Sequence, residues 1–218
     1  MASPAAPRLP PPPHPFRLLL HPERIWFRVH KFDRATGDFA PAAFNDSGRG
    51  WARFSPLVNP TIGKPVPTIY AASNEKAAIA EVVLHNVPTP STGYLHDLEA
   101  DYQAMLSLSR IRSPALSLVN LTATGLKAAG LTASDLFDGD EDDYARTQAW
   151  AQWIWESMPA AQGLHWMSKR DNRAEVVVLF GDRIAAGITD EGDSRPLRAY
   201  EQLIVDLLDE MGAGVAPT

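Results

Sequence analysis

The chain of 218 residues contains no cysteine. This absence excludes disulfides, thiolate catalysis and cysteine-based zinc or iron–sulfur sites. No apolar run approaches the roughly 20 residues that are needed to cross a bilayer. Prolines also interrupt residues 1–15, where the apolar stretch of a signal peptide would lie. We therefore expect a cytoplasmic protein that does not associate with membranes.

Clustered positive charge is absent as well. The formal net charge is -6, and no run of Lys or Arg is longer than two residues. Binding to nucleic acid depends on the neutralisation of many neighbouring phosphates, so we expect no direct nucleic-acid partner. A small basic pocket for a dinucleotide is still allowed, because net charge says little about a single cleft.

Several catalytic motifs are missing too. The sequence has no Gly-rich phosphate loop of the Walker or Rossmann type and no Gly-x-Ser-x-Gly elbow. The histidines contain no His-x-x-x-His pair, and none stands in an obvious carboxylate cluster along the chain. They are His14, His21, His30, His85, His96 and His165. We therefore expect no catalytic metal.

What remains is a globular composition, with 45% hydrophobic and 21% charged residues, enough for one sizeable core. The predicted strands and helices do not alternate strictly, which favours an α+β fold with a mixed, twisted β-sheet and flanking helices. Strands are predicted over residues 24–30, 68–72, 116–121 and 174–180, and helices over 74–86 (with Ser73 as N-cap), 124–129, 144–157 and 199–211. We divide the chain into a Pro/Ala-rich extension, residues 1–22, and a single domain, residues 23–218.

The predicted helix over residues 74–86 carries the strongest chemical signal. Its apolar residues leave few positions for water, so we expect the helix to be mostly buried. Glu81 has Ala77 and Ala78 one turn before it and His85 one turn after it. A carboxylate among small and apolar neighbours is costly unless it is paired or functional. Glu81 is thus either a carboxylate that faces a ligand or one partner of an ion pair with His85 or an arginine.

Other residues are weaker candidates by themselves. Tyr70 ends the strand that leads into this helix and is either a ligand contact or a core tyrosine with a satisfied hydroxyl. Arg28 lies in an aromatic strand, where a buried arginine binds an anionic ligand or forms a core salt bridge. Taken alone, Arg53 is a surface arginine and Ser168 a turn or cap serine, without the neighbours that would activate a nucleophile.

The order of these segments resembles the RES domain, a family named for an arginine, a glutamate and a serine. The matching segments are Phe27-Arg28-Val29, Arg53-Phe54-Ser55, Ile69-Tyr70-Ala71, Ala80-Glu81 and Gly163 through Ser168. The resemblance covers roughly residues 24–185. The chain departs from the family pattern at Phe27, where tyrosine is common, and at Ala52 and Ser55, where glycine and asparagine are common.

The resemblance implies a toxin of a bacterial toxin–antitoxin pair, with a fold similar to ADP-ribosyltransferase toxins, NAD as its substrate and a cognate antitoxin protein as its partner. It implies cleavage of the nicotinamide–ribose bond and transfer of ADP-ribose to a protein. For the ParT group within the family, the implied target is phosphoribosyl pyrophosphate synthetase. Two alternatives stay open: an NAD phosphorylase or glycohydrolase, with phosphate or water as acceptor, and a non-catalytic module that binds a nucleotide or a partner.

Given this substrate, each residue acquires an expected role. Loss of nicotinamide develops positive charge on the ribose, which the carboxylate of Glu81 would stabilise. Tyr70 would stack on or orient the nicotinamide, and Ser168 would donate a hydrogen bond to a ribose or amide group. Arg28 and Arg53 would hold the pyrophosphate. None of these residues is a covalent nucleophile, so the acceptor of ADP-ribose comes from outside.

Overall fold

The structure is a computed structural model that describes residues 12–31, 40–137 and 144–217. Residues 1–11 of the predicted extension lie outside the described part. Phe16 is buried and packs against Trp150 and Trp153, with ring centroids 6.0 and 6.1 Å apart. Residues Leu18–His21 form strand β1 of the main sheet. The folded domain therefore begins inside the segment that the sequence assigned to the extension.

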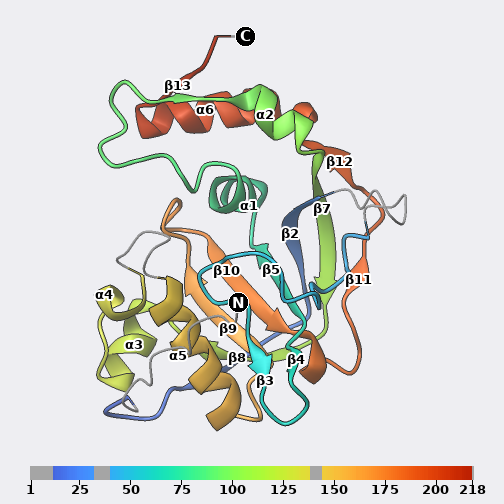
Figure 1. Ribbon diagram of the computed structural model, residues 1–218, viewed down its shortest axis with the longest axis vertical. Coiled ribbons are helices and arrows are strands. Elements are labelled where there is room, and N and C mark those ends of the chain that lie inside the picture. The colour runs from blue at the N-terminus through green and yellow to red at the C-terminus, as the bar shows by residue number, and fades with distance from the viewer. Residues whose placement is uncertain (1–11, 32–39, 138–143, 218) are drawn as a thin grey trace.

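The described strands form one nine-stranded sheet and two two-stranded sheets (Figure 1). The large sheet has the order β1-β8-β9-β10-β5-β2-β7-β11, and β12 also pairs with β7. Neighbours in it are antiparallel except β8 and β9, which are parallel. The predicted α+β fold with a mixed sheet is confirmed. The strands are β1 (Leu18–His21), β2 (Arg24–Lys31), β3 (Val58–Asn59), β4 (Lys64–Pro65), β5 (Thr68–Ala72), β6 (Leu95–His96), β7 (Leu106–Ser113), β8 (Leu116–Asn120), β9 (Gly163–Met167), β10 (Glu175–Phe180), β11 (Thr189–Asp190), β12 (Arg195–Pro196) and β13 (Gly214–Val215).

The helices are distributed unevenly around the sheet. In Figure 1, α1 lies between the sheet and α6, while α3, α4 and α5 gather near β8 and β9. Within the described residues, no helix combines the length and the apolar character needed to span a membrane. The helices are α1 (Glu75–Val82), α2 (Leu98–Gln103), α3 (Ala123–Ala129), α4 (Ala133–Leu136), α5 (Tyr144–Ser157) and α6 (Glu201–Met211), with the 3-10 turns η2 (Gly181–Arg183) and η3 (Leu197–Tyr200).

Helix α1 differs from its prediction at both ends. Its N-cap is Asn74, whose Oδ1 accepts a hydrogen bond from the Ala77 N–H at 2.7 Å. The prediction of Ser73 as N-cap is wrong, because the Ser73 hydroxyl accepts from the Glu175 N–H at 2.9 Å and the Ser73 N–H donates to the Glu175 carbonyl at 2.8 Å. Ser73 thus continues the pairing with β10, and the helix begins after it and ends at Val82.

The large sheet separates two apolar clusters. The first core cluster includes Ile79 of α1 and Trp166 and Val178 of the sheet. The second lies on the other face of the sheet and includes Trp26 and Val177. Because side chains alternate across a strand, neighbouring residues of one strand face different clusters. This alternation decides which of the predicted site residues can meet.

Candidate active site

The carboxylate of Glu81 is held by the turn that follows β9. Its Oε1 accepts hydrogen bonds from the Ser168 hydroxyl at 2.6 Å and from the Lys169 N–H at 3.0 Å. No ion pair of Glu81 is found among the described residues, and the Nδ1 of His85 lies 2.8 Å from the Val82 carbonyl. In the described part of the chain, no residue hydrogen-bonds Oε2 of Glu81. One oxygen is therefore fixed by the protein, and the other makes no hydrogen bond to the described residues.

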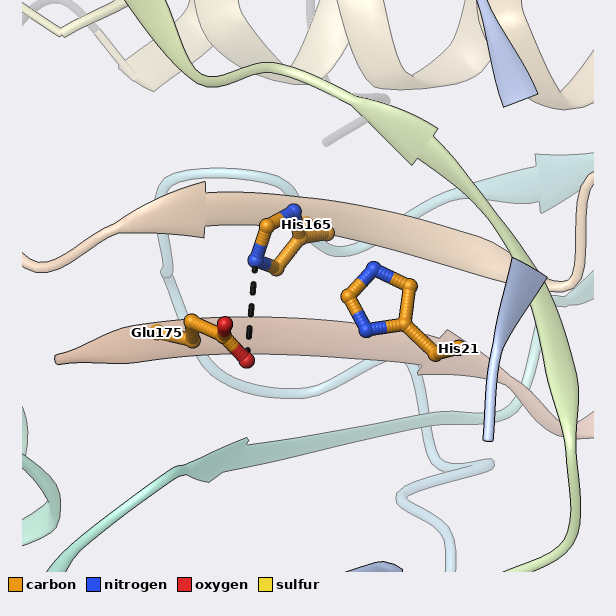
Figure 2. Close-up of side chains that lie close together, drawn as sticks. All are labelled: His21, His165 and Glu175. Atoms are coloured by element: carbon orange, nitrogen blue, oxygen red, sulfur yellow. Dashed lines mark ion pairs between the residues drawn. The ribbon is translucent and has the colours of Figure 1, made fainter. Parts of the chain in front are cut away.

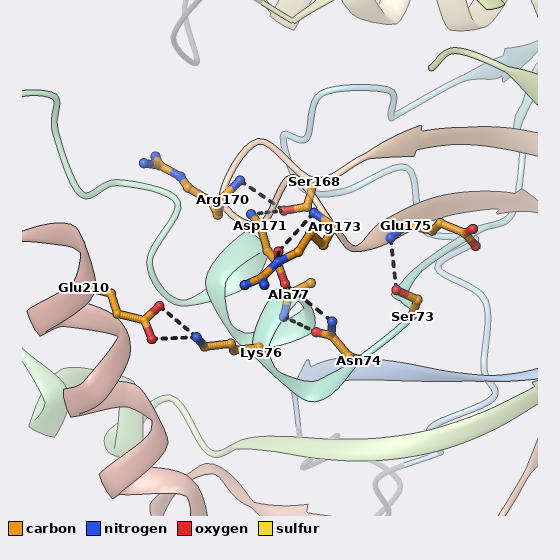
Figure 3. A network of polar contacts seen from close by, with 10 residues as sticks. All are labelled: Ser73, Asn74, Lys76, Ala77, Ser168, Arg170, Asp171, Arg173, Glu175 and Glu210. Atoms are coloured by element: carbon orange, nitrogen blue, oxygen red, sulfur yellow. Dashed lines mark hydrogen bonds and ion pairs between the residues drawn. The ribbon is translucent and has the colours of Figure 1, made fainter. Parts of the chain in front are cut away.

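Ser168 uses its whole hydrogen-bonding capacity inside the protein. The side chain is buried, and its hydroxyl donates to Glu81. The same hydroxyl accepts from the N–H groups of Arg170 and Asp171, both at 3.0 Å (Figure 3). A hydroxyl has one donor and two acceptor sites, and all three are engaged. Ser168 therefore positions Glu81 and the turn, rather than presenting its hydroxyl to a ligand.

The same turn, residues 168–173, runs along α1 and contacts both of its ends. At the start of the helix, Asn74 Nδ2 lies 3.5 Å from Asp171 Oδ2 (Figure 3). Beyond its end, the Arg170 guanidinium donates to the Val87 carbonyl at 3.2 Å and to the carbonyl of His85. Glu81 is thus held in a frame that is fixed before any substrate arrives.

Two cationic side chains meet next to this frame. Arg53 Nη1 donates to the Phe137 carbonyl at 3.2 Å, and Lys169 Nζ donates to the same oxygen. The Arg53 guanidinium also lies 5.2 Å from the centre of the Tyr144 ring. Arg53 therefore lies beside the side chain of Lys169, the residue whose backbone N–H binds Glu81. Sequence reasoning missed Lys169, which stands in a polar turn, although its position directly after Ser168 was a usable signal.

Tyr70 connects the segment of Arg53 to the sheet. Its hydroxyl accepts from the Phe54 N–H at 3.1 Å and donates to Ser55 Oγ at 3.2 Å. Burial raises the pKa of Tyr70 to about 12, so the phenol stays neutral. The ring lies 6.4 Å from that of Trp166, edge to face. Its hydroxyl is therefore satisfied within the protein.

Helix α5 supports this segment from its other side. Thr147 Oγ1 donates to the Arg53 carbonyl, and Gln148 Nε2 donates to the carbonyls of Ala52 and Ser55 at 2.9 and 2.8 Å. Both polar side chains are buried. Sequence reasoning missed them, and their signal was the presence of Thr and Gln within an otherwise apolar stretch of helix.

Arg28 does not join this group. Phe27 packs against the first core cluster, so the side chain of Arg28 points to the opposite face of the sheet. Its Nη1 donates to the carbonyls of Pro41 and Ala43, at 2.8 Å for the latter, and no described carboxylate pairs with it. Burial lowers the pKa of Arg28 to about 10. Arg28 fastens residues 41–43 over the second core cluster.

A cavity of about 300 Å³ lies at the N-terminal end of α1 and not at Glu81. A mixture of charged and aromatic side chains surrounds it. These are Phe27, Glu75, Arg110, Asp193, Arg195 and Tyr200. Arg110 and Asp193 form an ion pair, so part of this charge is already matched inside the protein.

The protein is thus an α+β domain with a mixed sheet, in which one carboxylate oxygen of Glu81 is held by the turn after β9. The fold is similar to a chain in the crystal structure of the M. tuberculosis MbcT-MbcA toxin-antitoxin complex, with a TM-score of 0.58 and 20% sequence identity over 85% of this chain and 91% of that chain. The family model of the RES domain matches residues 25–199, so the chain belongs to the RES domain family. A search of curated proteins finds no match.

Proposed function

We propose that this protein is the toxin of a toxin–antitoxin pair and that it cleaves NAD at the nicotinamide–ribose bond. Membership of the RES domain family supports NAD as substrate, and the likeness to a chain of a toxin–antitoxin complex supports a cognate antitoxin as partner. The observation that carries the proposal is the carboxylate of Glu81, fixed through one oxygen by Ser168 and Lys169.

The chemistry requires a fixed negative charge more than it requires a strong acid. The bond between the anomeric carbon of the ribose and the nicotinamide nitrogen breaks, and its electron pair leaves with neutral nicotinamide. Positive charge then develops on the sugar, as in glycoside cleavage. A carboxylate that is already oriented stabilises this charge without reorganising during the reaction. Oε2 of Glu81 is the oxygen that would face the ribose.

Arg53 and Lys169 would bind the pyrophosphate of NAD by charge-assisted hydrogen bonds. Both already converge on one carbonyl oxygen, that of Phe137, so their positive ends lie close together. The ring of Tyr70 would orient the nicotinamide. Ser168 acts through Glu81. Arg28 would reach the pyrophosphate only after release from Pro41 and Ala43, and we assign it to stability instead.

The second half of the reaction concerns the acceptor of ADP-ribose. Since no residue of the site is placed as a covalent nucleophile, the acceptor arrives from outside. Our first assignment is a protein, with phosphoribosyl pyrophosphate synthetase as the target that the family resemblance suggests. Phosphate and water are the alternatives, which make the enzyme an NAD phosphorylase or glycohydrolase. A module that binds a nucleotide or partner without turnover is the non-catalytic alternative.

The substitution Glu81→Gln tests the proposal. We expect nicotinamide release to fall by about 100-fold or more, the loss that follows removal of one electrostatic stabiliser, with an unchanged circular dichroism spectrum. The surface substitution Glu156→Gln, on α5, is the matched control and should retain activity. Full activity of Glu81→Gln would reject the assignment. No nicotinamide release by the wild type, with or without phosphate and cell extract, would favour the binding module.

The products identify the acceptor. Phosphate-dependent release of nicotinamide with formation of ADP-ribose-phosphate indicates a phosphorylase, and free ADP-ribose indicates a glycohydrolase. Label from radioactive NAD on one protein band of the extract indicates a transferase. Purified phosphoribosyl pyrophosphate synthetase then tests the named target directly.

The proposed roles of Arg28, Arg53 and Lys169 are distinguished by the affinity of their variants for NAD. Loss of one charge-assisted hydrogen bond should weaken binding about 10-fold in Arg53→Gln and in Lys169→Gln. In Arg28→Gln we expect unchanged NAD affinity and a lower melting temperature. Isothermal titration calorimetry with NAD measures the affinities. Equal loss of affinity in Arg28→Gln would return this residue to the site.

A further inference from the structure

A second cluster of chemically active side chains lies on the sheet face opposite α1. It consists of His21 at the end of β1, His165 in β9 and Glu175 at the start of β10 (Figure 2). In the register of β9 and β10, His165 lies opposite Val177, which belongs to the second core cluster. Glu175 precedes Val177 by two residues and therefore shares its face. The cluster is thus separated by the sheet from Glu81.

Three buried ring nitrogens of the two histidines have no hydrogen-bond partner in the described part of the chain. His165 is 4% exposed and His21 9%, yet neither Nδ1 nor Nε2 of His165, nor Nε2 of His21, has a hydrogen bond. Buried polar atoms without partners are rare in folded proteins and cost free energy. His165 Nε2 lies 3.9 Å from Glu175 Oε2, which is too far for a hydrogen bond. A neutral imidazole offers one N–H and one nitrogen lone pair, so these rings have unused hydrogen-bonding and ligating capacity that a bound metal ion or water would engage.

The three side chains point to a common space between the strands. The ring centroids of His21 and His165 are 4.4 Å apart, and one ligand atom from each of the three residues lies within 4.8 Å of the others. Figure 2 shows both imidazoles and the carboxylate turned toward one another. Burial lowers the pKa of both histidines, to about 4 for His165.

We propose that His21, His165 and Glu175 bind a divalent transition-metal ion, with zinc as the best match. Two neutral imidazoles and one carboxylate are a known zinc ligand set, with a fourth position open to water. Ligand atoms around tetrahedral zinc are about 3.3 Å apart. The present separations close to this value by side-chain shifts of at most about 1.5 Å, without a change in the strands.

The positive charge of Arg24 opposes the binding of a cation at this site. Its guanidinium contacts Oε2 of Glu175 and lies over the Trp26 ring, 4.3 Å from the centroid. Oε2 is also the carboxylate oxygen that faces His165 Nε2, at 3.9 Å, so it is the oxygen assigned to the metal. Carboxylate ligands of metals are commonly held by a further hydrogen bond of this kind. Arg24 thus orients Glu175 while its charge limits the affinity.

The ion would join three strands. β1 is an edge strand that pairs only with β8 among the described strands, and a metal bound by His21 would tie it to β9 and β10 as well. Its effect is on stability, because a ligand that binds the folded state shifts the unfolding equilibrium. This inference is independent of NAD cleavage, since no residue of the Glu81 frame takes part.

The experiment uses the full chain, treated with EDTA, desalted and then incubated with zinc chloride. We expect one zinc per chain by mass spectrometry after gel filtration, a higher melting temperature, and with cobalt a visible spectrum of a tetrahedral ion. His21→Gln and His165→Gln should each weaken zinc binding by about 100-fold or more, since even second-shell changes cost 10- to 100-fold. His30→Gln, at another buried histidine, is the matched control and should retain the metal.

Two results would overturn the proposal. One is a wild type that retains no zinc and whose melting temperature does not respond to it, the result expected if water fills the site. The other is zinc that binds equally well to His21→Gln and His165→Gln, which would place it elsewhere, for example at the pair of His96 and Asp101. If His165→Gln does not fold, His21→Gln and the partly exposed Glu175→Gln decide the question.

Discussion

The hydroxyl of Ser168 has one proton to donate, and it goes to Glu81. Removing this hydroxyl leaves the carboxylate with one donor and leaves the N–H groups of Arg170 and Asp171 without their acceptor. In the proposed reaction Ser168 acts through Glu81, so its loss should affect the rate constant of the chemical step rather than substrate binding.

We therefore expect Ser168→Ala to lower kcat for nicotinamide release by about 10- to 100-fold, the equivalent of one hydrogen bond to a charged group, with little change in KM. Steady-state kinetics measure both constants. Ser73→Ala is the matched control, because Ser73 also accepts a hydrogen bond from a backbone N–H but lies away from Glu81. A rise in KM with unchanged kcat would instead place the Ser168 hydroxyl on the substrate.

His30 is a second residue whose environment has a measurable consequence. Its Nε2 lies 2.7 Å from Ser109 Oγ, and burial, followed by the positive charge of Arg28, lowers its pKa from 6.5 to about 4. Between these values the unfolded chain binds a proton that the folded protein does not bind. The stability that depends on neutral His30 is therefore complete above pH 6.5 and is lost as the pH falls toward about 4.

Urea denaturation across this pH range checks the prediction. The free energy of unfolding of the wild type should fall with pH, and His30→Gln should show a shallower fall because it has no imidazole to protonate. A variant with the same slope as the wild type would show that other groups cause the pH dependence. NMR titration of the His30 ring would then locate its pKa directly.

At the scale of elements, α1 and the turn over residues 168–173 form one unit. Asn74 both caps the helix and reaches Asp171, so it links the start of α1 to the turn that holds Glu81. On the other side, Lys76 Nζ lies 2.7 Å from both carboxylate oxygens of Glu210 in α6 (Figure 3). The position of the carboxylate therefore depends on contacts at the far end of its own helix.

We expect Asn74→Ala to lower the free energy of unfolding by about 1 kcal/mol, the usual cost of a lost N-cap, and also to lower activity. Thr122→Ala is the matched control, because Thr122 caps α3 and lies in a different part of the fold. It should cost similar stability and leave the rate of NAD cleavage unchanged. Denaturation curves measure the stability and nicotinamide release measures the activity. Full activity of Asn74→Ala would show that the N-cap of α1 does not influence the position of Glu81.

At the scale of the whole molecule, the large sheet separates two groups of contacts. One face carries α1 and the Glu81 frame, and the other carries the second core cluster, the Arg28 contacts and the three residues of the proposed metal site. A substitution on one face of the sheet should therefore leave the contacts on the other face unchanged. Zinc binding by Glu81→Gln and NAD cleavage by His21→Gln are the paired measurements that express this independence.

Several strands and helices of the fold could be predicted from the local pattern of residues along the sequence. The segments of β5 and α5 were predicted with the bounds that the structure has, because a β-branched or aromatic run and a long uninterrupted helical stretch are local properties. β7 was missed although it pairs with β2 over eight residues. Its segment, Leu106–Ser113, is rich in serine and arginine, and its strand conformation depends on the neighbours that pair with it.

By itself the sequence determined the class of fold and the RES domain resemblance, and it singled out Glu81 as a candidate, because these depend on composition, on short motifs in order and on one carboxylate in an apolar segment. Only the tertiary structure decided that Ser168 and Lys169 hold Glu81 and that Arg28 faces away from it. It also brought together His21, His165 and Glu175, which are far apart along the chain. The physical reason is that strand alternation and sheet order set these distances, and both are fixed only when the strands pair.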